Sequence, residues 1–286
     1  MYKKVRPVDT LIRGLIWLCA IITIAITAGI IVYILIRGLP SISWSFLTTQ
    51  PSELHGTIGI LPNIINTLYI VIITLLIATP IGIGSAIYLT EYGGRSKLVK
   101  VIEFTTETLA GIPSIIYGLF GFMFFVVFMK LQYSIIAGGL TLAIMVLPTI
   151  IRTTQEALKS VNPLYREAAL GMGATRVHMI RTVLLPSAMP GIMTAVILSI
   201  GRIVGESAAL IFTAGIGTKM LRMTLPGFFE HFMTSGATLT VQLYQYAMRG
   251  EDLGISFAIA AVLVIIVLII NFSTKLLARR LNAKNS

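Results

Sequence analysis

Residues 14–36 read GLIWLCAIITIAITAGIIVYILI, an uncharged stretch of 23 residues between Arg13 and Arg37. A helix of about 20 apolar residues crosses the ~30 Å hydrocarbon core of a bilayer, so this stretch predicts a membrane span. The apolar core of a secretory signal is shorter, about 7–15 residues, and we therefore expect a retained first span. The single cysteine, Cys19, lies within it and cannot form a disulfide inside the chain.

The composition of the whole chain agrees with this reading. Of 286 residues, 56% are hydrophobic and only 12% are charged, and the mean hydropathy is +0.91. A soluble domain carries about 25% charged residues, roughly twice this fraction. Disorder is excluded because so apolar a chain collapses or inserts into a membrane. The composition disfavours a soluble enzyme and favours a polytopic membrane protein.

Five further apolar stretches follow the first, and the second contains Pro80 near its middle, where we expect a kink. The fold class predicted is an all-α polytopic membrane protein with six transmembrane helices in a single transmembrane domain, residues 14–286, after an N-terminal cytoplasmic segment, residues 1–13. The predicted spans are 14–36, 63–90, 108–129, 133–151, 183–215 and 254–272, with a cytoplasmic loop 152–182 and an external loop 216–253.

The positive-inside rule gives the expected orientation. With both termini inside, sixteen basic residues fall on the cytoplasmic side: Lys3, Lys4, Arg6, Arg13, Arg95, Lys97, Lys100, Arg152, Lys159, Arg166, Arg176, Arg181, Lys275, Arg279, Arg280 and Lys284. Five fall outside: Arg37, Lys130, Lys219, Arg222 and Arg249. The expected topology is therefore N-in, C-in. It also accounts for the net charge of +11 without a nucleic-acid partner.

The sequence contains no motif for catalysis or for a cofactor. No G-x-x-x-x-G-K-[ST] phosphate loop and no H-E-x-x-H are present, and no G-x-S-x-G is supported by a triad. His55, His178 and His231 are far apart, so we expect no metal site. The chain is predicted not to be an enzyme and to need no cofactor of its own.

The predicted loop 152–182 carries a helix–glycine turn–helix pattern. Asn162 is a typical N-cap and Pro163 suits the first helical position, which predicts a helix over Leu164–Leu170. Gly171 and Gly173 are expected to end this helix, and a second helical segment should run from about Thr175 to Pro186.

The same loop resembles the EAA motif of ABC importer permeases. The matching residues are Glu167-Ala168-Ala169, Gly173, Val183 in place of isoleucine, and Leu185-Pro186. The resemblance implies the type I importer (MetI-like) permease fold, and a coupling helix that docks into an ATPase subunit through Glu167, Ala168, Ala169 and Gly173. The alternative for Glu167 is a structural role, as a cap or paired with Arg166.

Three more stretches are similar to phosphate-import permeases, in the form typical of the PstA-type subunit: Gly111–Gly118, Arg202–Ala214 and Thr240–Ala247. Ala209 departs from the proline that many relatives carry. The resemblance implies a prokaryotic inner-membrane permease for phosphate, with an external binding protein, two ATP-hydrolysing subunits and a second, non-identical permease subunit. The alternatives are a permease for another oxyanion (phosphonate, sulfate or molybdate) and an ATP-independent channel or transporter.

Two charged residues of the fifth predicted span are candidates for the substrate pathway. Arg202 lies near the middle of that span, where a charge is costly and usually faces a cavity or a partner. Glu206 follows four residues later, so the two could pair on one helix face. We expect Arg202, Glu206, Ser207 and Ser114 to contact substrate; the alternative is a structural Arg202–Glu206 pair that locks the bundle. Gly201 and Gly205 suit close helix packing, within the chain or between subunits.

Overall fold

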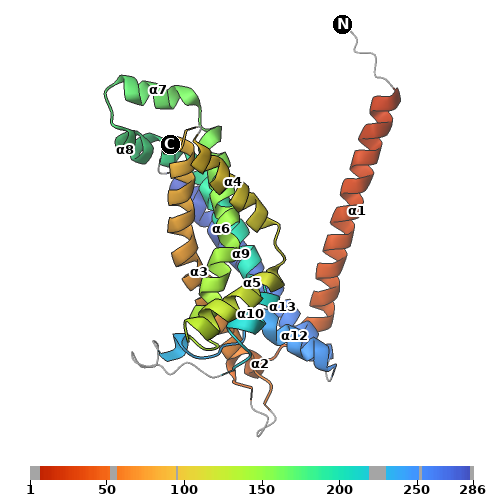
Figure 1. Cartoon of the computed structure of the whole chain (residues 1–286). Helices are drawn as coiled ribbons and strands as arrows, with labels where there is room; N and C mark the ends of the chain where they lie inside the picture. Colours follow the sequence, from red (N-terminus) through yellow and green to blue (C-terminus); the bar gives the residue numbers. More distant parts are fainter. Residues whose placement is uncertain (1–6, 52–56, 95, 219–229, 251–252, 284–286) are drawn as a thin grey trace.

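The computed structural model describes residues 7–51, 57–94, 96–218, 230–250 and 253–283, which form a bundle of helices (Figure 1). Within these residues, five helical stretches are long and apolar enough to cross a membrane: Leu11–Ser41, Leu61–Tyr92, Ile135–Ser160, Arg176–Val204 and Leu253–Leu276. A sixth candidate is a broken pair, Lys97–Ala110 and Ser114–Phe128, bent by 103°. The predicted all-α polytopic fold is confirmed.

The first half of the chain contributes three of these spans and the short segments between them. Its elements are α1 (Pro7–Gly38), the 3₁₀ turn η1 (Leu39–Ser41), α2 (Trp44–Thr48), α3 (Leu61–Ile87) with its π-helical extension η2 (Tyr88–Tyr92), α4 (Lys97–Ala110), and α5 (Ser114–Gly121) with its π-helical extension η3 (Phe122–Phe128).

The second half contains the central helix and the helices that pack around it. Its elements are α6 (Ile135–Ser160), α7 (Pro163–Gly171), α8 (Arg176–Met179) with the π-helical η4 (Ile180–Leu184), α9 (Leu185–Val204), α10 (Ala208–Thr213), α12 (Leu239–Arg249) and α13 (Leu253–Ala283).

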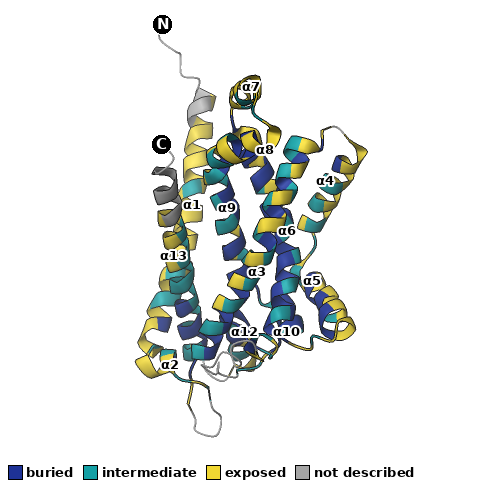
Figure 2. Ribbon diagram, turned by 90° about the vertical axis from the view of Figure 1, so that its left-hand side faces the viewer, coloured by how far each residue is buried: buried dark blue, intermediate teal, exposed yellow. Residues whose placement is uncertain are grey.

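Helix α6 is the centre of the bundle, with 67% of its apolar window buried (Figure 2). It packs against α3 on one side and α9 on the other. The α3–α6 contact is close because Gly139 has no side chain, and the Thr74 hydroxyl donates to the Gly139 carbonyl at 3.2 Å. Small residues and hydroxyl groups of this kind allow membrane helices to approach one another.

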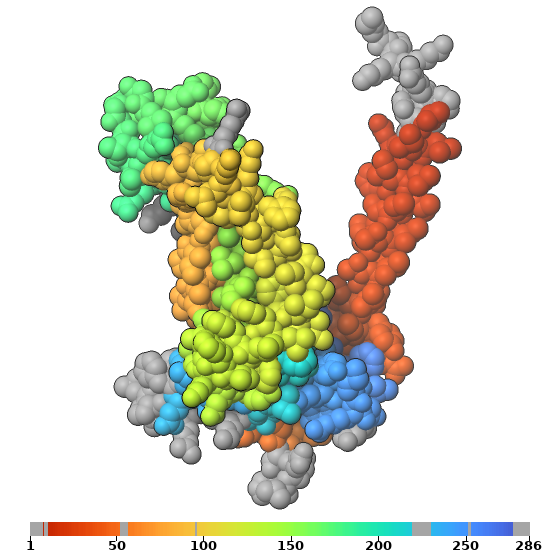
Figure 3. All heavy atoms as spheres, viewed as in Figure 1, coloured from red at the N-terminus to blue at the C-terminus, as the bar shows by residue number. Residues whose placement is uncertain are grey.

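Helix α1 differs, since none of its apolar window is buried. Figures 1 and 3 show it standing apart from the other helices along most of its length. It is held near its C-terminal end, where Gly38 lies against the backbone of Phe257 and the rings of Tyr33 and Phe257 meet edge to face at 5.6 Å. The start of α1 and the later part of α13 lie toward the same end of the bundle as α7 (Figure 2). We call this the α7 end and the opposite one the α12 end.

The third predicted span, 108–129, is wrong as a single straight helix. The structure has two helices there, α4 and α5, with the bend at residues 111–113. Pro113 has an extended ψ of 141°, so the helix does not continue through it, whereas α3 runs on through Pro80. The helical region therefore begins at Lys97, eleven residues before the predicted start.

The fifth predicted span, 183–215, is also displaced. One continuous helical run extends from Arg176 to Val204 and stops at residues 205–207, after which the short α10 follows. Helix α6 continues to Ser160, so the non-helical part of the predicted loop 152–182 is shorter than expected.

Some expectations fall outside the described residues. These are parts of the predicted segments 1–13 and 216–253, and the basic residues Lys3, Lys4, Arg6, Arg95, Lys219, Arg222 and Lys284.

Candidate functional site

Helix α7 is built by its capping residues, as the sequence predicts. The Asn162 side-chain oxygen accepts from the Leu164 N–H at 3.0 Å, and Pro163 occupies the first turn. Beyond the helix, Gly173 has a φ of +86°, a conformation that favours glycine. The chain then re-enters a helix at Thr175, whose hydroxyl accepts from the His178 N–H at 3.3 Å. These caps present α7 as a separate rigid unit at one end of the bundle.

The motif residues on α7 face two ways. None of its residues is buried; Glu167 and Ala168 are exposed, whereas Ala169 is partly buried against an apolar cluster of α3, α6, α8, η4 and α9. Arg166 turns to Glu91 at the end of α3, with 3.0 Å between Nε and the carboxylate. The suggested pairing of Glu167 with Arg166 is therefore not formed. The Glu167 side chain is exposed, whereas Arg166 contacts the bundle.

The second candidate region surrounds Arg202, which lies in the last turn of α9. The prediction that Arg202 lies near the middle of its span is wrong, because the helical run Arg176–Val204 ends two residues later. Its Nη1 donates to the hydroxyl of Thr149 on α6 at 3.4 Å. Thr149 is fourteen residues from Ile135, or about 21 Å along a helix about 39 Å long. Arg202 thus lies about midway along the central helix, and the negative end of the α9 dipole favours its charge.

Glu206 does not pair with Arg202, contrary to the prediction. The helix ends at Val204, so the two residues no longer share a helical face. Glu206 is buried, and its carboxylate accepts from the Ala209 N–H at 3.0 Å, which caps the start of α10. Its backbone carbonyl accepts from the Thr240 hydroxyl on α12 at 2.8 Å. Among the described residues, no ion pair joins Arg202 to an acidic side chain.

Two of the stretches that resemble phosphate-import permeases pack against each other. A β-carbon on Gly118 of α5 would stand 2.8 Å from the Ala209 Cα of α10. The neighbouring Tyr117 hydroxyl donates to the Leu109 carbonyl at the end of α4, across the bend, at 2.8 Å. Ser114 and Ser207 lie at the starts of α5 and α10 and are partly exposed. Within the described chain, neither serine side chain makes a hydrogen bond.

A buried polar cluster holds the chain together at the α12 end. His231 Nε2 lies 2.8 Å from Asn66 Oδ1, and the amides of Asn63 and Asn66 both donate to the Ala237 carbonyl at 3.1 Å. Because the Asn66 amide nitrogen donates elsewhere, its oxygen accepts and Nε2 carries the proton. Burial lowers the pKa of His231. The segment before α12 is thereby fixed to the start of α3.

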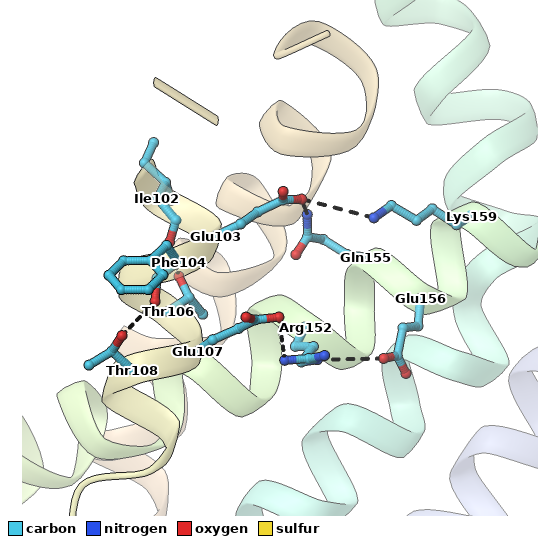
Figure 4. A network of polar contacts seen from close by, with 10 residues as sticks. All are labelled: Ile102, Glu103, Phe104, Thr106, Glu107, Thr108, Arg152, Gln155, Glu156 and Lys159. Atoms are coloured by element: carbon cyan, nitrogen blue, oxygen red, sulfur yellow. Dashed lines mark hydrogen bonds and ion pairs between the residues drawn. The ribbon is translucent and has the colours of Figure 1, made fainter. Parts of the chain in front are cut away.

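A network of exposed ion pairs joins α4 to α6 toward the α7 end (Figure 4). Arg152 pairs with Glu107 at 2.9 Å and with Glu156 at 3.8 Å, and Lys159 lies 4.0 Å from Glu103. The groups line a groove of about 410 Å³. Their side chains are 40–70% exposed, and such pairs contribute about 0–1 kcal/mol each.

The comparisons with known proteins agree with these features. The family described as "Binding-protein-dependent transport system inner membrane component" matches residues 78–283. The chain belongs to this family. It is 37% identical over 292 residues, 99% of each chain, to the "Probable ABC transporter permease protein YqgI" of Bacillus subtilis (strain 168). It is 34% identical over 267 residues to the "Phosphate transport system permease protein PstA" of Pasteurella multocida (strain Pm70), covering 92% of this chain and 88% of that one.

The fold also matches a solved importer. The chain resembles a subunit of the MetNI methionine ABC transporter in an inward-facing conformation, with a TM-score of 0.61 and 22% identity, over 78% of this chain and 94% of that one. The protein is thus a permease of the MetI-like, type I importer fold and a multi-pass inner-membrane component of an ABC transporter.

Several contacts of this permease were missed from sequence. The partners of Arg202 and Arg166, Thr149 and Glu91, lie 53 and 75 residues away along the chain, so no local pattern points to them. Asn63 and Asn66 could have been found, because two amides three residues apart at the start of an apolar run indicate a buried polar contact.

Proposed function

We propose that this permease is the transmembrane subunit of an ATP-driven importer that translocates inorganic phosphate delivered by an external binding protein. The observation that carries the proposal is Arg202, a cation about midway along α6 with a hydroxyl partner and no acidic partner among the described residues. A charge at this depth is costly unless it meets a polar cavity or a ligand.

The chemistry of the site suits a tetrahedral oxyanion. A guanidinium presents a planar fork of donors that matches two phosphate oxygens, and the hydroxyls of Ser114 and Ser207 could donate to the others. Glu206 would hold the start of α10, and hence Ser207, in position through its bond to Ala209. The similarity to a phosphate transport permease supports phosphate over the other oxyanions.

Energy would come from partner subunits. In this proposal α7 lies on the cytoplasmic side, and its Glu167–Ala168–Ala169 segment and Gly173 form the contact with an ATPase. The complete importer would contain two ATP-hydrolysing subunits, a second, non-identical permease and an external phosphate-binding protein. The family description, which names a binding-protein-dependent system, supports this assembly. Lipid would cover the remaining apolar surface.

The test is uptake by the complete complex in proteoliposomes. We expect ATP-dependent uptake of labelled phosphate that requires the binding protein and is outcompeted poorly by sulfate, molybdate and phosphonate. Preferential uptake of one of these would identify a permease for another oxyanion. Uptake without ATP would identify an independent channel or transporter. Loss of the co-purifying ATPase on Glu167→Ala, with Glu156→Ala on α6 as the control, would support the coupling role of α7.

A further inference from the structure

Helix α7 has few points of attachment to the membrane helices. Its described residues include no buried side chain, and among them only Ala169 packs against the apolar cluster formed by α3, α6, α8, η4 and α9. The polar attachment is made by one side chain, that of Arg166. Besides the chain itself, which joins α7 to α6 and α8, and the packing of α7 against η4, Arg166 therefore provides the side-chain polar link from α7 to the bundle in the described chain.

Arg166 bonds to two membrane helices at once. Its Nε donates to the Glu91 carboxylate of η2 at 3.0 Å, while Nη1 donates to the Val161 carbonyl at 3.0 Å and Nη2 to the Leu158 carbonyl at 2.6 Å. These two carbonyls end α6, where the helix dipole favours a cation. Three bonds from one rigid, planar group fix α7 to the ends of both α3 and α6.

This ion pair also differs from the others in its burial. The side chains of Arg166 and Glu91 are 20% and 9% exposed, whereas those of the other three ion pairs in the described chain are 40–70% exposed. Solvent and salt screen a buried pair less than an exposed one. The Arg166–Glu91 pair is therefore suited to persist when α7 moves, whereas an exposed ion pair exchanges its contacts with water.

We infer that Arg166 is a positioning residue that transmits movement of α7 to the membrane helices, with Glu91 and the end of α6 as its anchors. The inference rests on the proposed docking of α7 on an ATPase. Glu167 faces outward to the partner and Arg166 inward to the bundle. Helix α6, which Arg166 holds by its end, also carries Thr149, the partner of Arg202. A displacement of α7 would thus reach the proposed substrate site along α6.

The first experiment separates coupling from assembly in the complete complex. Arg166→Met removes all three bonds, Arg166→Lys keeps the charge without the fork, and Glu91→Gln removes one anchor. Glu107→Gln is the matched control, because it breaks an exposed Arg–Glu pair of similar length that joins α4 to α6. We expect assembled complexes that still hydrolyse ATP. Phosphate moved per ATP should fall at least about tenfold in Arg166→Met, less in Arg166→Lys and Glu91→Gln, and less than about twofold in the control.

The second experiment does not depend on the substrate. In a Cys19→Ser background, spin labels are placed at Met172, just after α7, and at Tyr88 in η2, both exposed. The distance between them should stay constant when an ATP analogue is added, because α7 and the end of α3 move together. In Arg166→Met the mean distance between the labels should change, or the distribution of distances should broaden, when the analogue is added.

Two outcomes would contradict the role of Arg166 as the link between α7 and the membrane helices. An unchanged phosphate-to-ATP ratio together with an unchanged label distance in Arg166→Met would overturn the inference. Loss of the assembled complex in all three variants would assign the pair to folding and overturn it as well. If the unaltered complex moves no phosphate, the proposed substrate is wrong, and the label distances alone then decide whether Arg166 is the link.

Discussion

The backbones of Gly118 and Ala209 lie so close that a β-carbon at position 118 would stand 2.8 Å from the Ala209 Cα. Gly118 belongs to α5, the second helix of a bent pair, and Ala209 to α10, which follows the break after α9. The two interrupted segments therefore meet through backbone atoms, which have no rotamers with which to relieve a clash.

Gly118→Val should destabilise this contact. Overpacking costs about 1–3 kcal/mol in a close-packed core, and here the obstructing atom is backbone. Thermal unfolding in detergent should show a lower midpoint for the variant. Gly84→Ala on α3 is the control, since nothing lies within 4 Å of its added carbon. An equal midpoint for the two variants would show that α5 and α10 are free to separate.

Gly173→Val should impair the connection behind α7. The φ of +86° at this position is unfavourable for a residue with a β-carbon by about 1–2 kcal/mol, and more for a branched one. We expect either loss of the ATPase from the purified complex or uncoupled ATP hydrolysis. Gly171→Ala, at a position without close neighbours and without a positive φ, should behave as the unaltered protein. Normal ATP-driven uptake by Gly173→Val complexes would contradict the proposed role.

Arg202→Ala should strongly reduce transport while leaving the complex assembled. Charge-assisted hydrogen bonds contribute about 1.5–3 kcal/mol, which corresponds to a loss of about 13–160-fold in uptake. Arg202→Lys should retain part of the activity, because it keeps the charge and loses the fork. Thr149→Val, which removes only the hydroxyl partner, should retain most of it. Uptake into proteoliposomes with assembly checked by co-purification measures these effects. Full transport by Arg202→Ala would remove this residue from the pathway, and lost assembly would favour a structural lock.

Acidification should weaken the fold at the α12 end. Burial lowers the pKa of His231, so the unfolded chain binds a proton at a higher pH than the folded one. Stability is therefore unaffected above the unfolded pKa of about 6.5, falls as the pH drops through that value, and levels off below the folded pKa. Unfolding midpoints between pH 8 and pH 5 measure this loss. His231→Gln should remove part of the slope, and an unchanged slope would show that His231 is not its source.

The sequence alone predicted those features of the fold that depend on neighbouring residues. Apolar length predicted the spans, and Asn162 and Pro163 predicted the start of α7, because capping depends on neighbouring residues. The break at 111–113 was missed since the apolar composition continues across it, although Pro113 was visible. The Arg202–Glu206 pair was wrong because it assumed an unbroken helix. Contacts such as Arg166 with Glu91 depend on how α3 and α7 are placed in space, which no local pattern specifies.

The separation of α1 from the other helices has a consequence for biogenesis. With none of its apolar window buried, α1 gains little from the rest of its own chain except near Gly38 and Phe257. It can therefore insert as an independent anchor during synthesis, long before the bundle closes. The finished subunit, if left as an orphan, would keep a helix with little burial against its own bundle. We expect pulse-chase labelling to show a shorter half-life for the orphan chain than for one made together with its sister subunit, and equal half-lives would refute this.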